Sequence, residues 1–282
     1  MKAWRRFHQR GWLMRLAIKC TFFALVVVLT LYPKPWLLPT WIGRLSDMNA
    51  VLDPSHPGLE PLAAKVRAAA PPGVASEELL RIVQDVVHER IPYAWDWDVW
   101  GVMDYLPTVA ETLEQGREDC DGRAVVAASL LRRLGYEAWL VSDLKHTWVQ
   151  TPAGETMEPG RTGKTLVSDE RGTHAQISLE SLSHLARGLA FGISVFPLTR
   201  ELIILAAFCA LAMHPWSSPS RRMLGCLLLV AALALFRCAP EAELHGVARP
   251  VFAWGGLLAA LAGAAVLLLR AGAIRSTQPP LE

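Results

Sequence analysis

Four long apolar segments constrain this chain more than any other feature of its sequence. The first runs from Leu16 to Leu38, directly after a basic N-terminus. The other three lie in the C-terminal third and cover about Ile193–Met213, Met223–Ala239 and Val251–Leu269. Each is close to the ~20 residues that a helix needs to cross the hydrocarbon core of a bilayer. The sequence therefore predicts an integral membrane protein with four transmembrane helices.

The first segment also has the polarity of a secretory signal peptide. No A-x-A-like cleavage site follows it, because the chain continues as Tyr32-Pro-Lys-Pro-Trp36. We interpret residues 1–39 as a cytoplasmic basic N-terminus and an uncleaved first transmembrane helix. A cleaved signal is the alternative.

The second segment is interrupted by three residues that are unusual in a membrane helix: Pro197, Arg200 and Glu201. In one interpretation the two charged side chains lie near the interface and extend into it. In the other, residues 185–199 lie on the membrane surface and the span begins later. We favour the first, because the stretch from Glu201 to Met213 is too short to cross by itself.

Charge divides the chain into three parts. The 52% hydrophobic and 19% charged content excludes a disordered protein. Residues 1–39 carry seven basic and no acidic side chains, whereas residues 40–185 carry 22 acidic and 13 basic ones. An acidic folded part argues against nucleic acid as a partner. Basic residues favour the cytoplasmic side, so we expect residues 40–185 outside the cytoplasm and both termini inside.

The part between the first and second spans is expected to fold as an α+β domain with its core at about residues 76–165. A Pro- and Ala-rich lead, which includes Asp53-Pro-Ser-His-Pro57 and Ala68–Pro72, is interpreted as a tether. Ser76 is expected to cap a helix in which apolar residues recur at helical spacing. Thr108-x-x-Glu111 is a capping-box pattern that predicts a short helix ending near Gly116.

A buried helix and two strands are expected to follow. Residues 121–134 have the pattern of a helix with a buried face, closed by Gly135. Glu137–Ser142 and Thr147–Thr151 are the two strand candidates.

Cys120 is the only one of five cysteines that falls in the expected extracytoplasmic domain. It therefore lacks a disulfide partner there, and it lies in a polar turn just before an apolar helix. The dipole at a helix start favours the thiolate, but Asp119 and Asp121 oppose ionisation, and the dipole contributes only ~0.3–1 kcal/mol. A nucleophile here requires a cationic partner. We select His146, at the start of the second strand, as that partner and as the general base.

A third group must fix the orientation and tautomer of the imidazole. Glu158 follows a turn at Pro152-Ala-Gly154, and a hairpin there would bring it alongside His146. The backbone N–H of Cys120 would form half of an oxyanion hole. Candidates for the second donor are Gln115, Trp100 and Tyr93.

This order of Cys, His and acid resembles the transglutaminase-like superfamily, and in particular its bacterial cysteine peptidases. The resemblance covers about residues 79–160 and is carried by HTWVQ and by GREDCDGRAVVAASLLRRLGYEAWLV. It implies a papain-like core with Cys120 as nucleophile, His146 as base and Glu158 as orienting acid, and it favours a bacterial cytoplasmic membrane as the location. The family more often has Asp at the third position, and the residues before its Cys usually read Gly-x-Cys, whereas Glu118 and Asp119 intervene here.

The resemblance implies thiol-dependent acyl transfer on a peptide or protein amide through a thioester, with water or an amine as acceptor. No organic cofactor is implied, and no C-x-x-C or H-x-x-x-H spacing supports a metal site at Cys120 and His146. Two alternatives remain open. One is a catalytically silent peptide-binding or sensor module. The other is a subunit of a membrane complex, docked through the small-residue run Gly255–Gly263.

Overall fold

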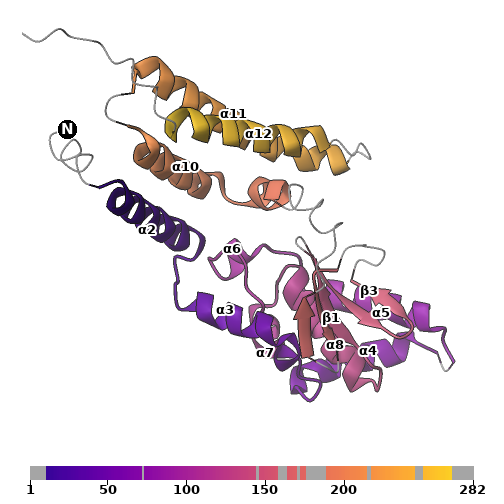
Figure 1. Ribbon diagram of the computed structural model, residues 1–282. Coiled ribbons are helices and arrows are strands. Elements are labelled where there is room, and N and C mark those ends of the chain that lie inside the picture. Colours follow the sequence, from indigo (N-terminus) through magenta and orange to yellow (C-terminus); the bar gives the residue numbers. More distant parts are fainter. Residues whose placement is uncertain are drawn as a thin grey trace, which may run out of the picture. The chain divides into compact units, whose positions relative to one another are not determined.

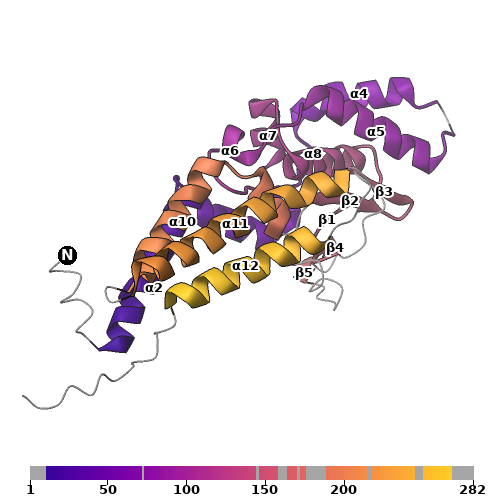
Figure 2. The same cartoon turned by 90° about the horizontal axis from the view of Figure 1, so that it is seen from above.

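The computed structural model describes residues 11–71, 73–143, 146–157, 164–169, 172–175, 189–214, 217–244 and 250–268. The chain divides into two compact units. One combines Met1–Thr30 with Leu189–Glu282, and the other is Leu31–Gly188. The first holds the long apolar helices and the second holds the sheet (Figures 1 and 2).

Three helices in the described residues are long and apolar enough to cross a membrane. Trp12–Leu31 forms α2, Pro219–Leu244 forms α11, and Pro250–Leu268 forms α12. Their apolar side chains are largely exposed, as a lipid environment requires. Within the unit, Phe23 of α2 meets Phe208 of α10 (Leu198–Ala212) edge to face, with ring centroids 5.6 Å apart.

The expected span over Ile193–Met213 is not one straight helix. The chain forms a short helix, Leu189–Val195, and then α10, and the two meet at an angle of 118°. Pro197 stands at this break and supplies no backbone N–H that could continue the first helix. Among the described residues three helices are therefore long enough to span a membrane by themselves, and the fourth expected transmembrane helix is a bent pair, which makes a fourth span only if the pair crosses as one unit.

The bend is fixed by Arg237 of α11. One guanidinium nitrogen donates to the backbone carbonyls of Ile193 and Phe196 and to the carboxylate of Glu201, the last at 2.8 Å. Glu201 is buried, in contrast to the expectation that its side chain extends into the interface. The partner of its carboxylate is the guanidinium of Arg237 on another helix.

The helices α11 and α12 lie side by side, and glycines allow their close approach (Figures 1 and 2). A Cβ at Gly263 would lie 3.0 Å from the carbonyl oxygen of Gly225, and one at Gly256 would lie 2.9 Å from Phe236. Two glycines of the small-residue run thus face α11 of the same chain. This contact accounts for them without a partner protein.

The second unit contains a five-stranded antiparallel sheet in the order β3-β2-β1-β4-β5. Helices α5 and α8 pack against strands β1 to β3 and against each other. The chain is therefore α+β, as expected. The strands are β1 (Trp139–Ser142), β2 (Thr147–Thr151), β3 (Gly154–Thr156), β4 (Leu166–Asp169) and β5 (Gly172–Ala175).

The helix α8, Cys120–Arg133, is the centre of this unit. Its residues from Ala124 to Leu131 are fully buried, and the side chain of Trp148 on β2 is fully buried as well. Helix α5, Ser76–Arg90, contributes a second buried face. It begins at Ser76 as predicted, but the expected side-chain cap is absent because Ala75 occupies the N-cap position.

The capping box predicted at Thr108 is confirmed. The hydroxyl of Thr108 accepts a hydrogen bond from the backbone N–H of Glu111, and the carboxylate of Glu111 accepts one from the backbone N–H of Thr108. The helix α7 (Val109–Gln115) ends at its C-cap residue Gly116, which has a φ of 67°. Arg44 adds a two-pronged ion pair with Glu111 at 2.7 and 3.1 Å. Burial opposes ionisation of Glu111, but hydrogen bonds from Arg44 and Thr108 prevail and lower its pKa.

The Pro- and Ala-rich lead is not a tether, and the core begins well before residue 76. The buried side chains of Met48, Leu59 and Val66 all belong to the main core cluster. An isolated view of the sequence misses this because the apolar residues are spread over several short elements. These are α3 (Leu37–Ser46), η1 (Met48–Val51), η2 (Pro57–Leu59), α4 (Glu60–Ala69) and, after α5, the short α6 (Asp96–Val99).

Candidate active site

The first residue of α8 is Cys120, which places its partly exposed thiol at the helix N-terminus. Asp119 is the N-cap, and its carboxylate accepts a hydrogen bond from the backbone N–H of Asp121 at 3.0 Å. Only glycine fits at position 122, because a Cβ there would clash with the side chain of Glu118. Local sequence thus fixes where the helix begins and where the sulfur lies.

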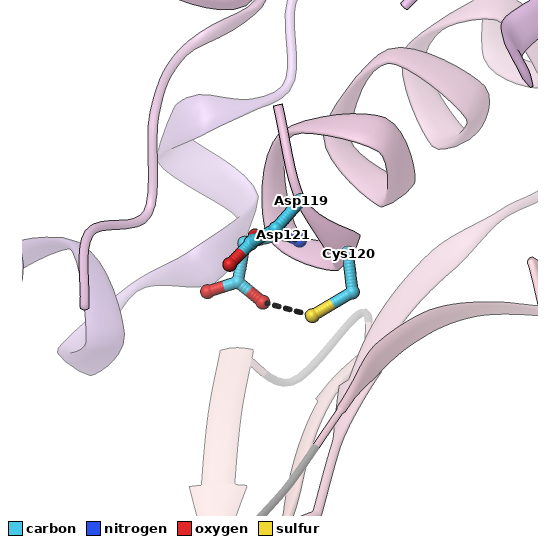
Figure 3. A group of neighbouring side chains, drawn as sticks. All are labelled: Asp119, Cys120 and Asp121. Carbon is cyan, nitrogen blue, oxygen red and sulfur yellow. Dashed lines mark hydrogen bonds between the residues drawn. The ribbon is translucent and has the colours of Figure 1, made fainter. Parts of the chain in front are cut away.

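Two contacts hold the sulfur. The thiol donates to the carboxylate of Asp121, with 3.4 Å between Sγ and Oδ1 (Figure 3). The backbone N–H of Thr147 lies close enough to the same sulfur to act on the pKa of the thiol. Thr147 is the first residue of β2 and follows His146 directly. The fold therefore brings Cys120 close to the start of β2, which His146 directly precedes.

The surroundings of the thiol favour its neutral form. Burial, followed by the negative charges of Asp119 and Asp121, raises the pKa of Cys120 well above its ordinary value, and the N–H of Thr147 opposes this only in part. The helix dipole suggested a lowered pKa. It is outweighed by burial of the thiol and then by the negative charges of Asp119 and Asp121.

The imidazole of His146 is oriented by main-chain atoms. Its Nε2 lies 3.1 Å from the carbonyl oxygen of Met157, which can only accept, so Nε2 carries a proton; in a neutral ring the lone pair is then on Nδ1. Its backbone N–H donates to Asp143 at 2.7 Å. Glu158, the predicted orienting acid, lies outside the described residues. No side-chain pattern could have revealed the Met157 carbonyl, since every residue has one.

Five carboxylates gather around the start of α8. Besides Asp119 and Asp121 they are Asp96, Asp104 and Glu118, and burial is the leading cause of a raised pKa in all five. Glu118 is fully buried, accepts from the indole N–H of Trp100 and the backbone N–H of Asp119, and has a pKa raised to about 7.

Contacts between carboxylates require a proton or a cation between them. Asp96 lies near Glu118 and Asp104 near Asp121, and in each case the neighbouring negative charge adds to the effect of burial in raising the pKa. The ligand oxygens of Asp96, Glu118 and Asp119 lie within 4.8 Å of one another, as do ligand atoms of Asp119, Cys120 and Asp121. Either group is compact enough to hold a small cation. Shared protons account for the same contacts, and no further donor distinguishes the two cases.

The three candidates for the second oxyanion donor differ in the structure. Trp100 gives its N–H to Glu118 and is therefore already engaged. Gln115 is exposed at the end of α7. Burial is the main cause of a raised pKa of Tyr93, so its hydroxyl stays protonated and remains a donor, and Cys120 is among the groups close enough to affect that pKa. Tyr93 is thus the best placed of the three.

An aromatic row extends from Tyr93. Its ring meets Trp95 edge to face at 5.0 Å, and Trp95 stacks on Trp97 at 4.9 Å. The guanidinium of Arg123, one turn along α8 from Cys120, lies 5.0 Å from the Tyr93 ring centroid. Tyr93 is 45% exposed, so the row offers a partly open surface next to the sulfur.

Comparison with known proteins adds no assignment. No family model matches the chain, and no curated protein sequence matches it either.

Proposed function

We propose that this protein is a membrane-anchored thiol-dependent amide hydrolase of the transglutaminase-like type, with a papain-like arrangement of helix and sheet and its active site outside the cytoplasm. The observation that carries the proposal is that the thiol of Cys120, at the N-terminus of α8, lies close enough to the backbone N–H of Thr147, at the start of β2, for that N–H to act on its pKa. This supports the proposal because Thr147 directly follows His146, the candidate base for a cysteine nucleophile.

The neutral thiol defines how the reaction would begin. Because the pKa of Cys120 is raised, the proton leaves the sulfur as the sulfur attacks, and not beforehand. The lone pair on Nδ1 of His146 accepts that proton while Nε2–H stays bonded to the carbonyl of Met157. This is general-base catalysis by a neutral imidazole.

The remaining steps follow from the same groups. The sulfur forms a bond to the amide carbon, and the charge that develops on the oxygen is met by the backbone N–H of Cys120 and the hydroxyl of Tyr93. The imidazolium returns its proton to the leaving amine, which leaves a thioester on Cys120. Water, deprotonated by His146, then attacks the thioester, releasing a carboxylic acid and restoring the thiol.

A peptide or protein is the proposed substrate. The aromatic row from Tyr93 to Trp97 and the cation of Arg123 offer stacking and charge beside the nucleophile. We propose water as the acceptor, because an exposed domain in bulk water needs a dedicated pocket to exclude it in favour of an amine.

A silent binding module is the second candidate, and one observation favours it. Burial and two adjacent acids hold the thiol neutral, and the same environment would suit a cysteine that only packs. The two candidates differ in what His146 does to the sulfur.

The distinguishing experiment uses the full-length protein in nanodiscs and pulses of iodoacetamide from pH 5 to 10. Trypsin cuts after Arg117 and Arg123, so the peptide Glu118–Arg123 reports alkylation of Cys120 alone. For the hydrolase, His146→Ala should slow alkylation at pH 7 by about tenfold or more, while the matched control His174→Ala should not. Identical profiles in all three proteins would leave the binding module as the better function.

The acceptor is tested separately. The protein is incubated with a peptide mixture in ¹⁸O-water that contains a primary amine. Hydrolysis gives new C-termini labelled with ¹⁸O, whereas transamidation gives amine adducts, and Cys120→Ala should abolish either product.

A further inference from the structure

Met157 has an unusual backbone conformation at the point where it contacts His146. Its φ is 65°, and among the described residues it is the one non-glycine residue with a positive φ. Its side chain is almost fully buried. Such a conformation persists in an L-residue only where the surroundings hold it, so the contacts of Met157 must do so.

Gln84 of α5 provides that restraint. Its side-chain carbonyl oxygen accepts the backbone N–H of Met157 at 2.9 Å. One residue earlier, the hydroxyl of Thr156 donates to the backbone carbonyl of Leu80 at 3.0 Å and approaches the same Gln84 oxygen at 3.5 Å. Helix α5 therefore holds the end of β3 through both residues, and the Gln84 acceptor is the contact made to Met157 itself.

The carbonyl of Met157 is the other end of the same residue, and it accepts from Nε2 of His146 at 3.1 Å. A chain of contacts thus runs from Gln84 through the Met157 backbone to the imidazole. We propose that Gln84 is a positioning residue for His146: it sets the direction of the Met157 carbonyl and thereby the tautomer of the imidazole. The inference rests on the proposed function, because it assigns a role in presenting the base to Cys120.

The physical consequence of losing the acceptor is specific. Without it, Met157 can relax to an ordinary negative φ, which turns its carbonyl away from Nε2. The imidazole would then lose the bond that keeps its proton on Nε2, and a smaller fraction would present a lone pair at Nδ1. The charged groups that face His146 from its own loop and from α8, Asp143 and Asp121, are unchanged by the substitution.

Two variants separate the acceptor from the size of the side chain. Gln84→Glu keeps an acceptor oxygen, whereas Gln84→Met keeps the length and removes the acceptor. In the alkylation assay on peptide Glu118–Arg123, we expect Gln84→Glu to follow the wild-type pH profile. Gln84→Met should slow alkylation of Cys120 at pH 7 by roughly three- to tenfold and move the profile towards higher pH.

A double-mutant cycle with His146→Ala shows whether Gln84 acts through the imidazole. If it does, Gln84→Met has no further effect once His146 is absent. An equal effect in both backgrounds would mean that Gln84 only supports the fold, and it would overturn the inference. The inference would also be overturned if the alkylation profile of Gln84→Met matched that of the wild type while the profile of His146→Ala shifted. If His146→Ala itself has no effect, the proposed function fails first.

A second variant keeps the test decisive if Gln84→Met does not fold. Gln84→Asn retains the amide but withdraws it by one methylene, so that it no longer reaches Met157. It should reproduce the slower alkylation, with thermal unfolding near that of Gln84→Glu. A wild-type profile in folded Gln84→Asn would count against the inference.

Discussion

The thiol of Cys120 donates a hydrogen bond to the carboxylate of Asp121, the next residue in the chain. The charge of that carboxylate is also one of the reasons that the pKa of Cys120 is raised, after burial and Asp119. Replacing Asp121 by Asn keeps the shape and removes the charge. We expect the apparent pKa of Cys120 to fall and alkylation at pH 7 to become about three- to tenfold faster.

Site-resolved alkylation measures this effect, with Asp85→Asn as a control because Asp85 lies on the exposed side of α5, paired with Arg81. A slower reaction or an unchanged profile in Asp121→Asn would show that the Asp121 charge does not act on the sulfur.

Glu118 makes the stability of the sheet-containing unit depend on pH. Burial raises its pKa from 4.5 to about 7, so between these values the folded state holds a proton that the unfolded state has released. The stabilisation is therefore complete below pH 4.5 and is lost as the pH rises to 7. Thermal unfolding of the full-length protein should show a Tm that falls by several degrees over this interval.

The variant Glu118→Gln should make that dependence less steep, because a neutral amide does not titrate, although the other buried carboxylates still contribute. Glu137→Gln, at an exposed position, should leave the slope as in the wild type. A wild-type Tm that rises between pH 4.5 and 7 would contradict the assignment of a raised pKa to Glu118.

Gly263 is expected to be indispensable for packing of α11 against α12. A Cβ there would lie 2.9 Å from Leu229 Cγ and 3.0 Å from a backbone oxygen, so Gly263→Val forces the helices apart. We expect a loss of about 1–3 kcal/mol of stability, read as a lower Tm in detergent. Gly255→Ala on the same helix is the matched control, because its Cβ would meet only Leu235 at 3.7 Å. Equal losses in both variants would exclude close packing at Gly263.

Removing Arg237 alone should destabilise the protein more than removing both Arg237 and Glu201. Arg237→Leu leaves the buried carboxylate of Glu201 without its cation and two backbone carbonyls without their donor. The double variant Arg237→Leu with Glu201→Leu removes the stranded charge. We expect its Tm to lie between those of Arg237→Leu and the wild type, since the carbonyls remain unsatisfied. A double variant less stable than Arg237→Leu alone would show that the pair is not energetically coupled.

Local patterns in the sequence predicted many of the elements of the sheet-containing unit. The box at Thr108 and Glu111, the αL residue Gly116 and the strand Thr147–Thr151 all depend on contacts within a few residues, so propensity and spacing suffice to find them. The lead before residue 76 was misjudged because its short helices are stabilised mainly by burial against α5 and α8, which no local pattern encodes.

The sequence by itself determined that this chain has long apolar helices, an acidic α+β part between them, and a cysteine at the start of a buried helix. These follow from composition and periodicity. Only the tertiary structure decided that Arg237 holds one expected span as a bent pair, that burial keeps the thiol neutral, and that a main-chain carbonyl faces the imidazole. Each of those depends on groups distant in sequence, or on backbone atoms common to every residue, so their effect exists only once the chain has folded.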